Sequence, residues 1–525
     1  MSHGDLHKLR LLQSIVTVGV VTLASRVLGF IRDILIAAVL GAGIGADAFF
    51  VAFKMPNLFR RLFAEGAFSM AFVPMFAGRL EDEGLSAAKE FAEQALSVLI
   101  CILLLFVVVL QISMPIVMLI FAPGFIVDPS KFNLAVELTR ITFPYLLFVS
   151  VVSLMAGVLN SLGKFAAAAA TPILLNLSLI GAILFLAPYM SSASHALAWG
   201  VSGAGVLQLI WLYGACGRQR IWLKVPRPHL TPCVRSLLKR MAPVAVGAGI
   251  YQVNLVIDTA IASLLSTGSI SYLFYADRVN QLPLGVLGVA VGTVLLPMLS
   301  RQVRGGDNLG ALYSQNRALE ISLLIAVPAA IALAVIADPI IRVLFERGAF
   351  GSLETKATAA ALGMYALGLP AYVMVKALAP GFFGREDTLT PVKIAIFCLF
   401  INLILNLILM GPYKHVGIAA ATVVSSWVNA VFLAWVLFRR GHLIIDDRLI
   451  ARFPGIILAS LIMGVALYFA DSLLAQNFIG SMSGGVFALA ILVLGGMVIY
   501  GLLVLAFKVS SVEEIKSLYK GGGKN

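Results

Sequence analysis

Eight charged side chains lie within a short segment of the chain whose apolar runs are those of membrane-spanning helices. An ionisable group at bilayer depth costs about 3 kcal/mol unless it faces a cavity or a partner. Five of the eight are cations and three are acids, so the segment carries a surplus of positive charge that favours an anionic ligand. The eight residues are Arg26, Arg32, Asp33, Asp47, Lys54, Arg60, Arg61 and Glu65.

Four of the five cations in this segment are arginines, and arginine binds some anions better than lysine does. A guanidinium group presents a planar fork of N–H donors that binds paired phosphate oxygens bidentately and stays ionised at physiological pH. The segment therefore fits an anionic ligand that carries phosphate. The alternative is that the cations extend to the membrane interface and form structural ion pairs only. The residues expected to support the arginines through ion pairs are Asp33, Lys54, Glu65 and Asp277.

The amino-acid composition indicates which class of protein contains these charged residues. The chain of 525 residues is 60% hydrophobic and 12% charged, with a mean hydropathy of +1.00, whereas soluble domains average about 25% charged residues. This composition predicts an all-α polytopic membrane protein, since helices satisfy their own backbone hydrogen bonds in lipid. At roughly 20 apolar residues per crossing, we expect about 14 transmembrane helices. Two of them are consecutive spans at 390–411 and 416–438.

The net charge of +13 comes mainly from loops on one side of the predicted membrane. If the N-terminus is cytoplasmic, the inner loops and the C-terminal tail hold most lysines and arginines outside the spans. This bias is the one that the positive-inside rule expects, and it places both termini in the cytoplasm. It also argues against a nucleic-acid partner. The outer loops hold only Lys131, Arg342, Arg347 and Lys414.

The chain also contains an internal repeat. Asn57 and Pro74 of the second predicted helix correspond at one constant offset to Asn280 and Pro297. This pattern predicts two six-helix lobes related by a pseudo-two-fold axis along the membrane normal, with substrate bound between them. The predicted domains are an N-lobe (1–217), a basic cytoplasmic linker expected to form an amphipathic helix (218–240), a C-lobe (241–440), and two further helices with a basic tail (441–525).

Four segments carry a resemblance to a known family, and together they extend over most of the chain. They are SRVLGFIRD (25–33), GADAFFVAFKMPNLFRRLFAEGAFSMAFVP (45–74), FYADRVNQLPLGVLGVAVGTVLLP (274–297) and LAPGFFGREDTLTPVKIA (378–395). The chain resembles the MurJ (MviN) lipid II flippases of the multidrug/oligosaccharidyl-lipid/polysaccharide exporter superfamily. The resemblance implies 14 helices in two lobes around a central cavity. It further implies flipping of lipid II, a disaccharide-peptide on undecaprenyl diphosphate, to the outer leaflet of the bacterial cytoplasmic membrane.

The resemblance also assigns site residues. The family's cavity arginines match Arg26, Arg32, Arg60 and Arg278, and its acidic cavity residue matches Asp47. With the neighbouring Arg61, these residues form the predicted substrate-binding set. An acid that the family often carries is replaced here by Gln281, which leaves the second lobe more positive.

A second group of polar residues predicts a sodium site. Asp258, the pair Asn402 and Asn406 on one helix face, and Thr422 offer oxygen ligands from three predicted helices. Some relatives in the family bind sodium at matching positions, with a backbone carbonyl at the place of Ile418. The alternative is an interhelical hydrogen-bond cluster without an ion. Sodium is the only candidate cofactor.

Other function classes find less support in the sequence. The chain has no Walker A, HExxH or nucleophile-elbow motif, and we therefore expect no enzyme activity. The four cysteines and six histidines are dispersed and predict neither disulfides nor a zinc site. A multidrug-type antiporter of cations is the alternative function, although its cavity would be acidic. We expect a monomer whose partners are lipid II and, as candidates, proteins of peptidoglycan synthesis.

Overall fold

The computed structural model describes residues 3–61, 68–478 and 482–510, and within these ranges the chain consists of helices and their connections. The all-α class predicted from the sequence is confirmed. The contacts between Cα atoms divide the chain into two compact units. The N-terminal unit comprises Met1–Ser271 with Arg347–Phe350, and the C-terminal unit comprises Tyr272–Glu346 with Gly351–Asn525.

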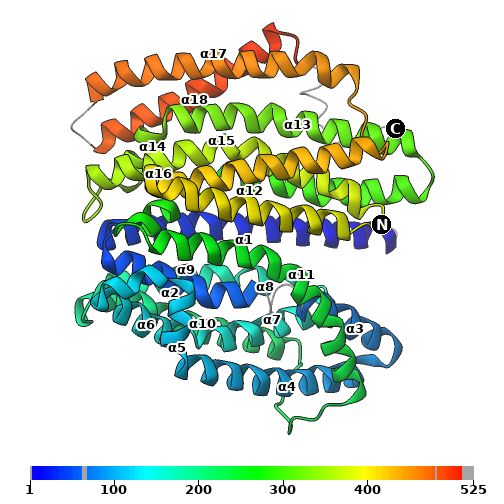
Figure 1. Ribbon diagram of the computed structural model, residues 1–525. Coiled ribbons are helices and arrows are strands. Elements are labelled where there is room, and N and C mark those ends of the chain that lie inside the picture. The colour runs from blue at the N-terminus through cyan, green and yellow to red at the C-terminus, as the bar shows by residue number, and fades with distance from the viewer. Residues whose placement is uncertain (1–2, 62–67, 479–481, 511–525) are drawn as a thin grey trace. The chain divides into compact units, whose positions relative to one another are not determined.

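The N-terminal unit is built around α10, which packs against α2, α6, α7 and α9. Figure 1 shows this unit in blue to green. Its longer helices are α1 (His3–Leu40), α2 (Ile44–Phe59), α3 (Ser69–Asp82), α4 (Gly84–Ile112), α6 (Pro129–Thr142), α7 (Tyr145–Ser161), α9 (Thr171–Gly181), α10 (Ala193–Arg218) and α11 (Pro232–Ser263). Shorter helical elements are α5 (Met114–Phe121), η2 (Pro123–Val127), α8 (Phe165–Ala169), η3 (Ala182–Leu186) and η4 (Ala187–Tyr189).

The C-terminal unit is built around α15, which packs against α13, α14 and α16. Its helices are α12 (Ser269–Arg304), α13 (Asn308–Val335), α14 (Ala337–Phe345), α15 (Ser352–Phe383), α16 (Leu389–Arg439), α17 (Asp447–Phe478) and α18 (Met482–Ala506). The first three residues of α12 belong to the N-terminal unit. α16 is two helices that meet at Lys414, whose φ of 50° and ψ of −132° are not helical. The break falls between the two spans predicted for this stretch.

Nine helical stretches among the described residues are long and apolar enough to cross a membrane. Their outward faces are apolar, as lipid contact requires: on α4, Leu105 is 67% and Ile112 76% exposed. The stretch Leu389–Arg439 counts once among the nine although Lys414 divides it. The structure therefore supports a multi-pass membrane protein, and the total of about 14 spans stays a prediction.

The basic linker, predicted to be helical over 218–240, is helical only in part. Residues 221–231 form no helix, and α11 begins at Pro232 and so includes residues 232–240. Ile221 and Leu223 alternate with exposed neighbours and are buried in the core of the N-terminal unit. Pro226 and Pro228 explain the extended backbone, because proline removes a backbone donor and disfavours the helical region in the residue before it. α11 contacts α3 and α4 and so belongs to the N-terminal unit in this structure.

Four residues of the loop between α14 and α15, 347–350, are attached to the end of α1. The amide of Ala349 donates to the carbonyl of Ala38 at 2.8 Å. Gly41 and Gly348 both have positive φ, and a Cβ on Gly348 would lie 2.2 Å from the Ala38 oxygen. Only glycine permits this approach of the two backbones. Residues 347–350, called the tether below, therefore belong to the N-terminal unit although the helices on either side belong to the other.

The last two long helices pack side by side, and α17 also lies along α13 (Figure 1). Apolar contacts hold part of this interface: Ile456, Val504 and Val509 pack with Leu324. The Tyr500 hydroxyl donates to the Leu324 carbonyl at 2.7 Å. The α17–α18 pair is thus an integral part of the C-terminal unit.

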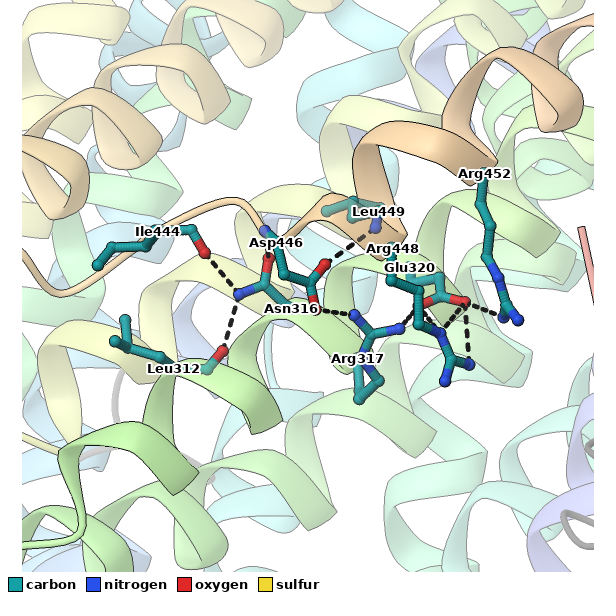
Figure 2. Close-up of polar contacts among 9 residues, drawn as sticks. All are labelled: Leu312, Asn316, Arg317, Glu320, Ile444, Asp446, Arg448, Leu449 and Arg452. Carbon is teal, nitrogen blue, oxygen red and sulfur yellow. Dashed lines mark hydrogen bonds and ion pairs between the residues drawn. The ribbon is translucent and has the colours of Figure 1, made fainter.

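An ionic network centred on Glu320 adds a second attachment of α17 to α13 (Figure 2). Glu320 is only 6% exposed and pairs with Arg452 at 2.6 Å, with Arg448 at 3.3 Å and with Arg317 on its own helix. Arg317 also pairs with Asp446, whose carboxylate accepts from the Leu449 amide at the start of α17. One buried carboxylate therefore compensates three arginines from two helices. The Glu320 network comprises Arg317, Glu320, Asp446, Arg448 and Arg452.

We expect Glu320→Gln to lower the thermal stability of the purified protein markedly, because it leaves Arg317 and Arg452 in a buried site without their shared counter-charge. Removing one partner of a buried pair costs about 3–5 kcal/mol, and the 40% exposure of the Arg448 side chain favours the lower end of that range. The matched control is Asp338→Asn, which breaks the exposed pair with Arg342 and should cost about 0–1 kcal/mol. Equal shifts in melting temperature would contradict this assignment.

Candidate functional site

The carboxylate of Asp47, in the first turn of α2, joins three segments of the N-terminal unit. Asp47 is 1% exposed. Its Oδ2 accepts from the Lys131 ammonium and from the Gly268 amide, each at 2.8 Å. Its Oδ1 accepts from the Ser271 amide at 3.1 Å and from the Ser271 hydroxyl at 2.6 Å. These four residues form what we call the Asp47 clamp.

The clamp is electrostatically well matched. The two amides belong to the first turn of α12 and the turn before it, where free N–H groups and the helix dipole favour a negative charge. Lys131, in α6, is 5% exposed and also lies 4.4 Å from the centre of the Phe125 ring. Both oxygens of the carboxylate are thus engaged within the protein. The predicted role of Asp47 in substrate binding stays a prediction, and the structure shows a buried clamp at the predicted outer ends of the helices.

Arg32 and Asp33 form a second buried group, between α1 and α9. The Arg32 guanidinium pairs with the Asp33 carboxylate at 2.7 Å and donates to the Asn176 Oδ1 atom at 2.8 Å. Asn176 in turn donates to the Ser25 carbonyl at 2.9 Å. Gly29 lies beside the Asn176 side chain, and a Cβ there would make van der Waals contact with it at 3.4 Å. Asp33 thus pairs with the arginine beside it, and its supporting role in substrate binding stays a prediction.

The other cations of the segment lie in different surroundings. Arg26 on α1 and Arg61 beyond α2 are exposed. The Lys54 ammonium donates to the Thr259 hydroxyl on α11 at 3.3 Å. The Arg60 Nε atom donates to Asn57 at 3.2 Å. Glu65, the last of the predicted supporting residues in this segment, lies outside the described residues.

Arg60 also lies on the wall of a cavity of about 380 Å³ inside the N-terminal unit. The helices α3, α7, α9 and α10 and the short α8 contribute the rest of the wall. This cavity, called the N-unit cavity below, is partly open to the outside, and one predicted substrate-binding arginine lines it.

Arg278 lies in the C-terminal unit, on α12. Its guanidinium carbon lies 5.1 Å from the centre of the Phe274 ring, at a distance suited to a cation–π contact. The neighbouring Asp277 accepts a hydrogen bond from Gln281, one turn along the helix. Gln281, which replaces an acid common in the family, therefore interacts with the carboxylate that was expected to support Arg278.

The residues predicted to bind sodium are divided between the two units. On α16, the buried Asn406 donates to Asn402 at 3.0 Å, and the Thr422 hydroxyl donates to the Ile418 carbonyl at 3.1 Å. Each of these bonds joins residues one turn apart on the same helix, so they do not distinguish a sodium site from an interhelical hydrogen-bond cluster. Asp258 belongs to α11 in the N-terminal unit. Among the described residues, no group of three His, Cys, Asp or Glu side chains is arranged to hold a metal. Sodium binding stays a prediction.

Sequence reasoning missed Lys131 as a site residue. It appeared only as one of four cations in the predicted outer loops, and its partner Asp47 is 84 residues away in the chain. The pattern of local residues carries no signal for such a distant pair. The Glu320 network was missed for the same reason, since Glu320 and Arg452 are 132 residues apart.

Comparison with known proteins places the chain in a family. The family model described as "Lipid II flippase MurJ" matches residues 36–488. The chain belongs to the MurJ family. It is 44% identical over 519 residues to a probable lipid II flippase MurJ of Rhizobium meliloti (strain 1021), covering 98% of this chain and 97% of that one. The lipid II flippase MurJ of Burkholderia cenocepacia is 38% identical over 437 residues, with coverage of 82% and 85%.

Solved structures agree with this placement. A lipid II flippase MurJ in an inward closed conformation superimposes with a TM-score of 0.77 at 27% identity, covering 94% of this chain and 98% of that one. An inward-facing multidrug resistance transporter of the MATE family gives a TM-score of 0.65 at 12% identity, with coverage of 80% and 98%. The similarity to the MATE transporter shows a shared fold only. The chain therefore shares a fold with the wider superfamily and its sequence with the MurJ flippases.

We expect Asp47 and Lys131 to be strongly coupled in a double-mutant cycle. Asp47→Asn leaves Lys131 buried without its counter-charge, and Lys131→Met does the converse, so each single variant should lower the melting temperature. The double variant should lower it by less than the sum, with a coupling energy of about 0.5–3 kcal/mol. The half-exposed pair of Lys89 and Glu93, at 3.7 Å, is the control and should show little coupling. Additive effects at the clamp would contradict the pairing.

Proposed function

We propose that this protein flips lipid II from the inner to the outer leaflet of the bacterial cytoplasmic membrane. The observation that carries the proposal is membership of the MurJ family over most of the chain. The arginines that the family resemblance assigns to substrate are present in both units: Arg26, Arg32 and Arg60 in the first and Arg278 in the second. Arginine suits this substrate, because its planar fork matches the paired oxygens of a diphosphate.

The described arginines divide into two groups by their surroundings. Arg32 is 4% exposed and engaged by Asp33 and Asn176, so its charge is compensated inside the protein. Arg26 is exposed, and Arg60 borders the N-unit cavity. We propose that Arg26, Arg60 and Arg278 contact the diphosphate. Arg32 then positions α1 against α9 and supplies positive potential from within the unit.

We propose that the Asp47 clamp is the outer gate of an alternating-access cycle. It joins the start of α2 to the start of α12, and both ends are predicted to face the outside. An opening that moves the start of α12 away from α2 breaks its bonds, and the state with the clamp formed is stabilised by them. Such a cycle needs two states whose free energies differ by only a few kcal/mol, and the buried clamp contributes to that difference.

A multidrug-type antiporter is the competing function. The MATE transporters among the structural matches share 12–14% identity with this chain, which speaks for the fold alone. A pocket for cationic drugs needs acidic groups, whereas the predicted substrate-binding positions are mainly arginines. The family comparison likewise favours transport over catalysis. We further propose that the protein acts as a monomer with both termini in the cytoplasm, in contact with proteins of peptidoglycan synthesis.

Alanine at Arg26, Arg60 or Arg278 should abolish complementation of a bacterium depleted of its own lipid II flippase, while protein level and membrane insertion stay normal. Lysine should restore function only in part, because the charge survives without the bidentate fork. The readout is survival together with exposure of lipid II on the outer face. Arg342→Ala, at an exposed arginine paired with Asp338, is the control and should complement fully. Full activity of the three alanine variants would show that these arginines are not needed to bind the substrate.

Cysteines at Ala46 and Ser269 should allow the proposed gate to be locked. Both positions are buried and adjoin the clamp residues Asp47 and Gly268. In a background without Cys101, Cys216, Cys233 and Cys398, a short reducible crosslinker should stop flipping, and reduction should restore it. The two single-cysteine proteins, treated with the same reagent, are the controls. A crosslinked protein that flips at the normal rate would require a static path in place of alternating access.

A further inference from the structure

The basic linker (218–240) carries seven cations that have no part in the proposed transport cycle. All seven side chains are exposed, and among the described residues none of them forms an ion pair or a hydrogen bond within the protein. Other cations on the predicted cytoplasmic side differ, since Arg304 pairs with Glu386 and Arg440 with Asp387. The linker thus presents positive charge that the protein itself leaves uncompensated. The seven are Arg218, Arg220, Lys224, Arg227, Arg235, Lys239 and Arg240.

The linker is fixed to the N-terminal unit by its inward side chains and by its backbone. Ile221, Leu223 and Leu237 belong to the core of the unit. The backbone amide of Lys224 donates to the Glu93 carboxylate at 2.9 Å. This acid therefore binds the backbone of the linker and not one of its cations. The cations are held at set places on the surface of the unit, because the segment that carries them is packed on the core.

Two aromatic rings indicate the depth of the linker relative to the membrane. α10 is long and apolar enough to cross a membrane, and it ends at Arg218 on the predicted cytoplasmic side. Near this end, the Tyr213 ring contacts the Trp222 ring of the linker edge-on, with 5.2 Å between their centres. Tyr213 is 41% and Trp222 50% exposed. Tyrosine and tryptophan are enriched at the headgroup level of membranes. The pair therefore indicates that the linker lies at the level of the lipid headgroups.

The exposed side of the linker combines its cations with apolar side chains. Val225 is 61% and Leu230 59% exposed. A loop surrounded by water gains nothing from such side chains. At a membrane interface, apolar side chains insert at the boundary of the acyl chains while neighbouring cations attract anionic headgroups. The composition of this surface therefore fits a lipid interface better than it fits water or an acidic protein.

The surface also contains a hollow of suitable size and chemistry at the start of α11. Its volume is about 320 Å³. Two cations and one hydroxyl group supply donors for phosphate oxygens, and the remaining lining residues are apolar. The described residues that line the hollow are Leu230, Pro232, Arg235, Ser236 and Lys239.

We infer that the basic linker binds anionic phospholipid headgroups of the cytoplasmic leaflet, with Arg235 and Lys239 contacting a headgroup phosphate in the hollow. The inference goes beyond the proposed function and does not depend on it. Uncompensated cations that are fixed at headgroup level attract anionic lipids electrostatically. The linker then anchors the inner end of the N-terminal unit to this leaflet.

The test measures which lipid contacts the linker of the full-length protein. A fluorophore is attached at Val225→Cys in a background without the four native cysteines, and the protein is placed in bilayers of phosphatidylcholine and phosphatidylglycerol. One of the two lipids carries a spin label that quenches the fluorophore. Labelled phosphatidylglycerol, the anionic lipid, should quench more strongly than labelled phosphatidylcholine at low salt. The preference should fall as salt is added, because salt screens the attraction.

Arg235→Gln combined with Lys239→Gln should lower the preference for phosphatidylglycerol by up to about five-fold for each cation, the factor expected for one basic residue at an anionic surface. Arg235→Lys combined with Lys239→Arg keeps both charges and should keep the preference. The matched control is Arg304→Gln combined with Arg440→Gln, which removes two cations that have acidic partners. It should leave the preference at Val225 unchanged. Melting temperatures check that each variant is folded.

Equal quenching by the two lipids in the wild type would overturn the inference and leave the cations to water or to an acidic protein. A preference that survives in the double glutamine variant would overturn it too. An equal loss in the matched control would do the same, because the preference would then follow the net charge and not the linker. A fluorophore at Val127→Cys, 86% exposed on the predicted outer side, should show no preference. The same preference there would contradict a site at the linker.

Discussion

A charge held inside an apolar helix bundle must be compensated by a nearby partner, and this requirement organises the structure. Arg32 is compensated by Asp33 and Asn176, Asp47 by Lys131 and two backbone amides, and Glu320 by three arginines. In each case the partners come from different helices. The polar groups therefore fix which helices are neighbours, while apolar packing fills the space between them.

The charges that are paired within the protein hold helices together, whereas the charges proposed to bind the ligand do not have this function. The Asp47 clamp and the Glu320 network are saturated by protein groups, so they favour particular arrangements of helices. Arg26 is exposed, and Arg60 lies at a cavity whose wall carries neutral polar groups. In the proposed function, the diphosphate of the substrate pairs with these arginines. Binding and gating can thus be served by separate sets of residues in the same helices, with α2 carrying Asp47 at its start and Arg60 at its end.

Local patterns in the sequence predicted the helical class, the break between the two halves of α16, the arginine-rich segment and the family. Each of these rests on composition or on residues close together in the chain. The partners of Arg32 and Asp47 on other helices, Asn176 and Lys131, are 144 and 84 residues away, and no local pattern specifies such pairs. The linker is helical only from Pro232 onward. The alternation of Ile221 and Leu223 with exposed residues, together with Pro226 and Pro228, explains why the stretch before it is not helical.

The tether changes how the two units are connected. The chain passes between them after Ser271, before Arg347 and after Phe350. The first passage lies in the first turn of α12, and the other two lie at the ends of the tether, which is bonded to α1. A cut in the chain after Ser271 would therefore leave the two units joined through the tether.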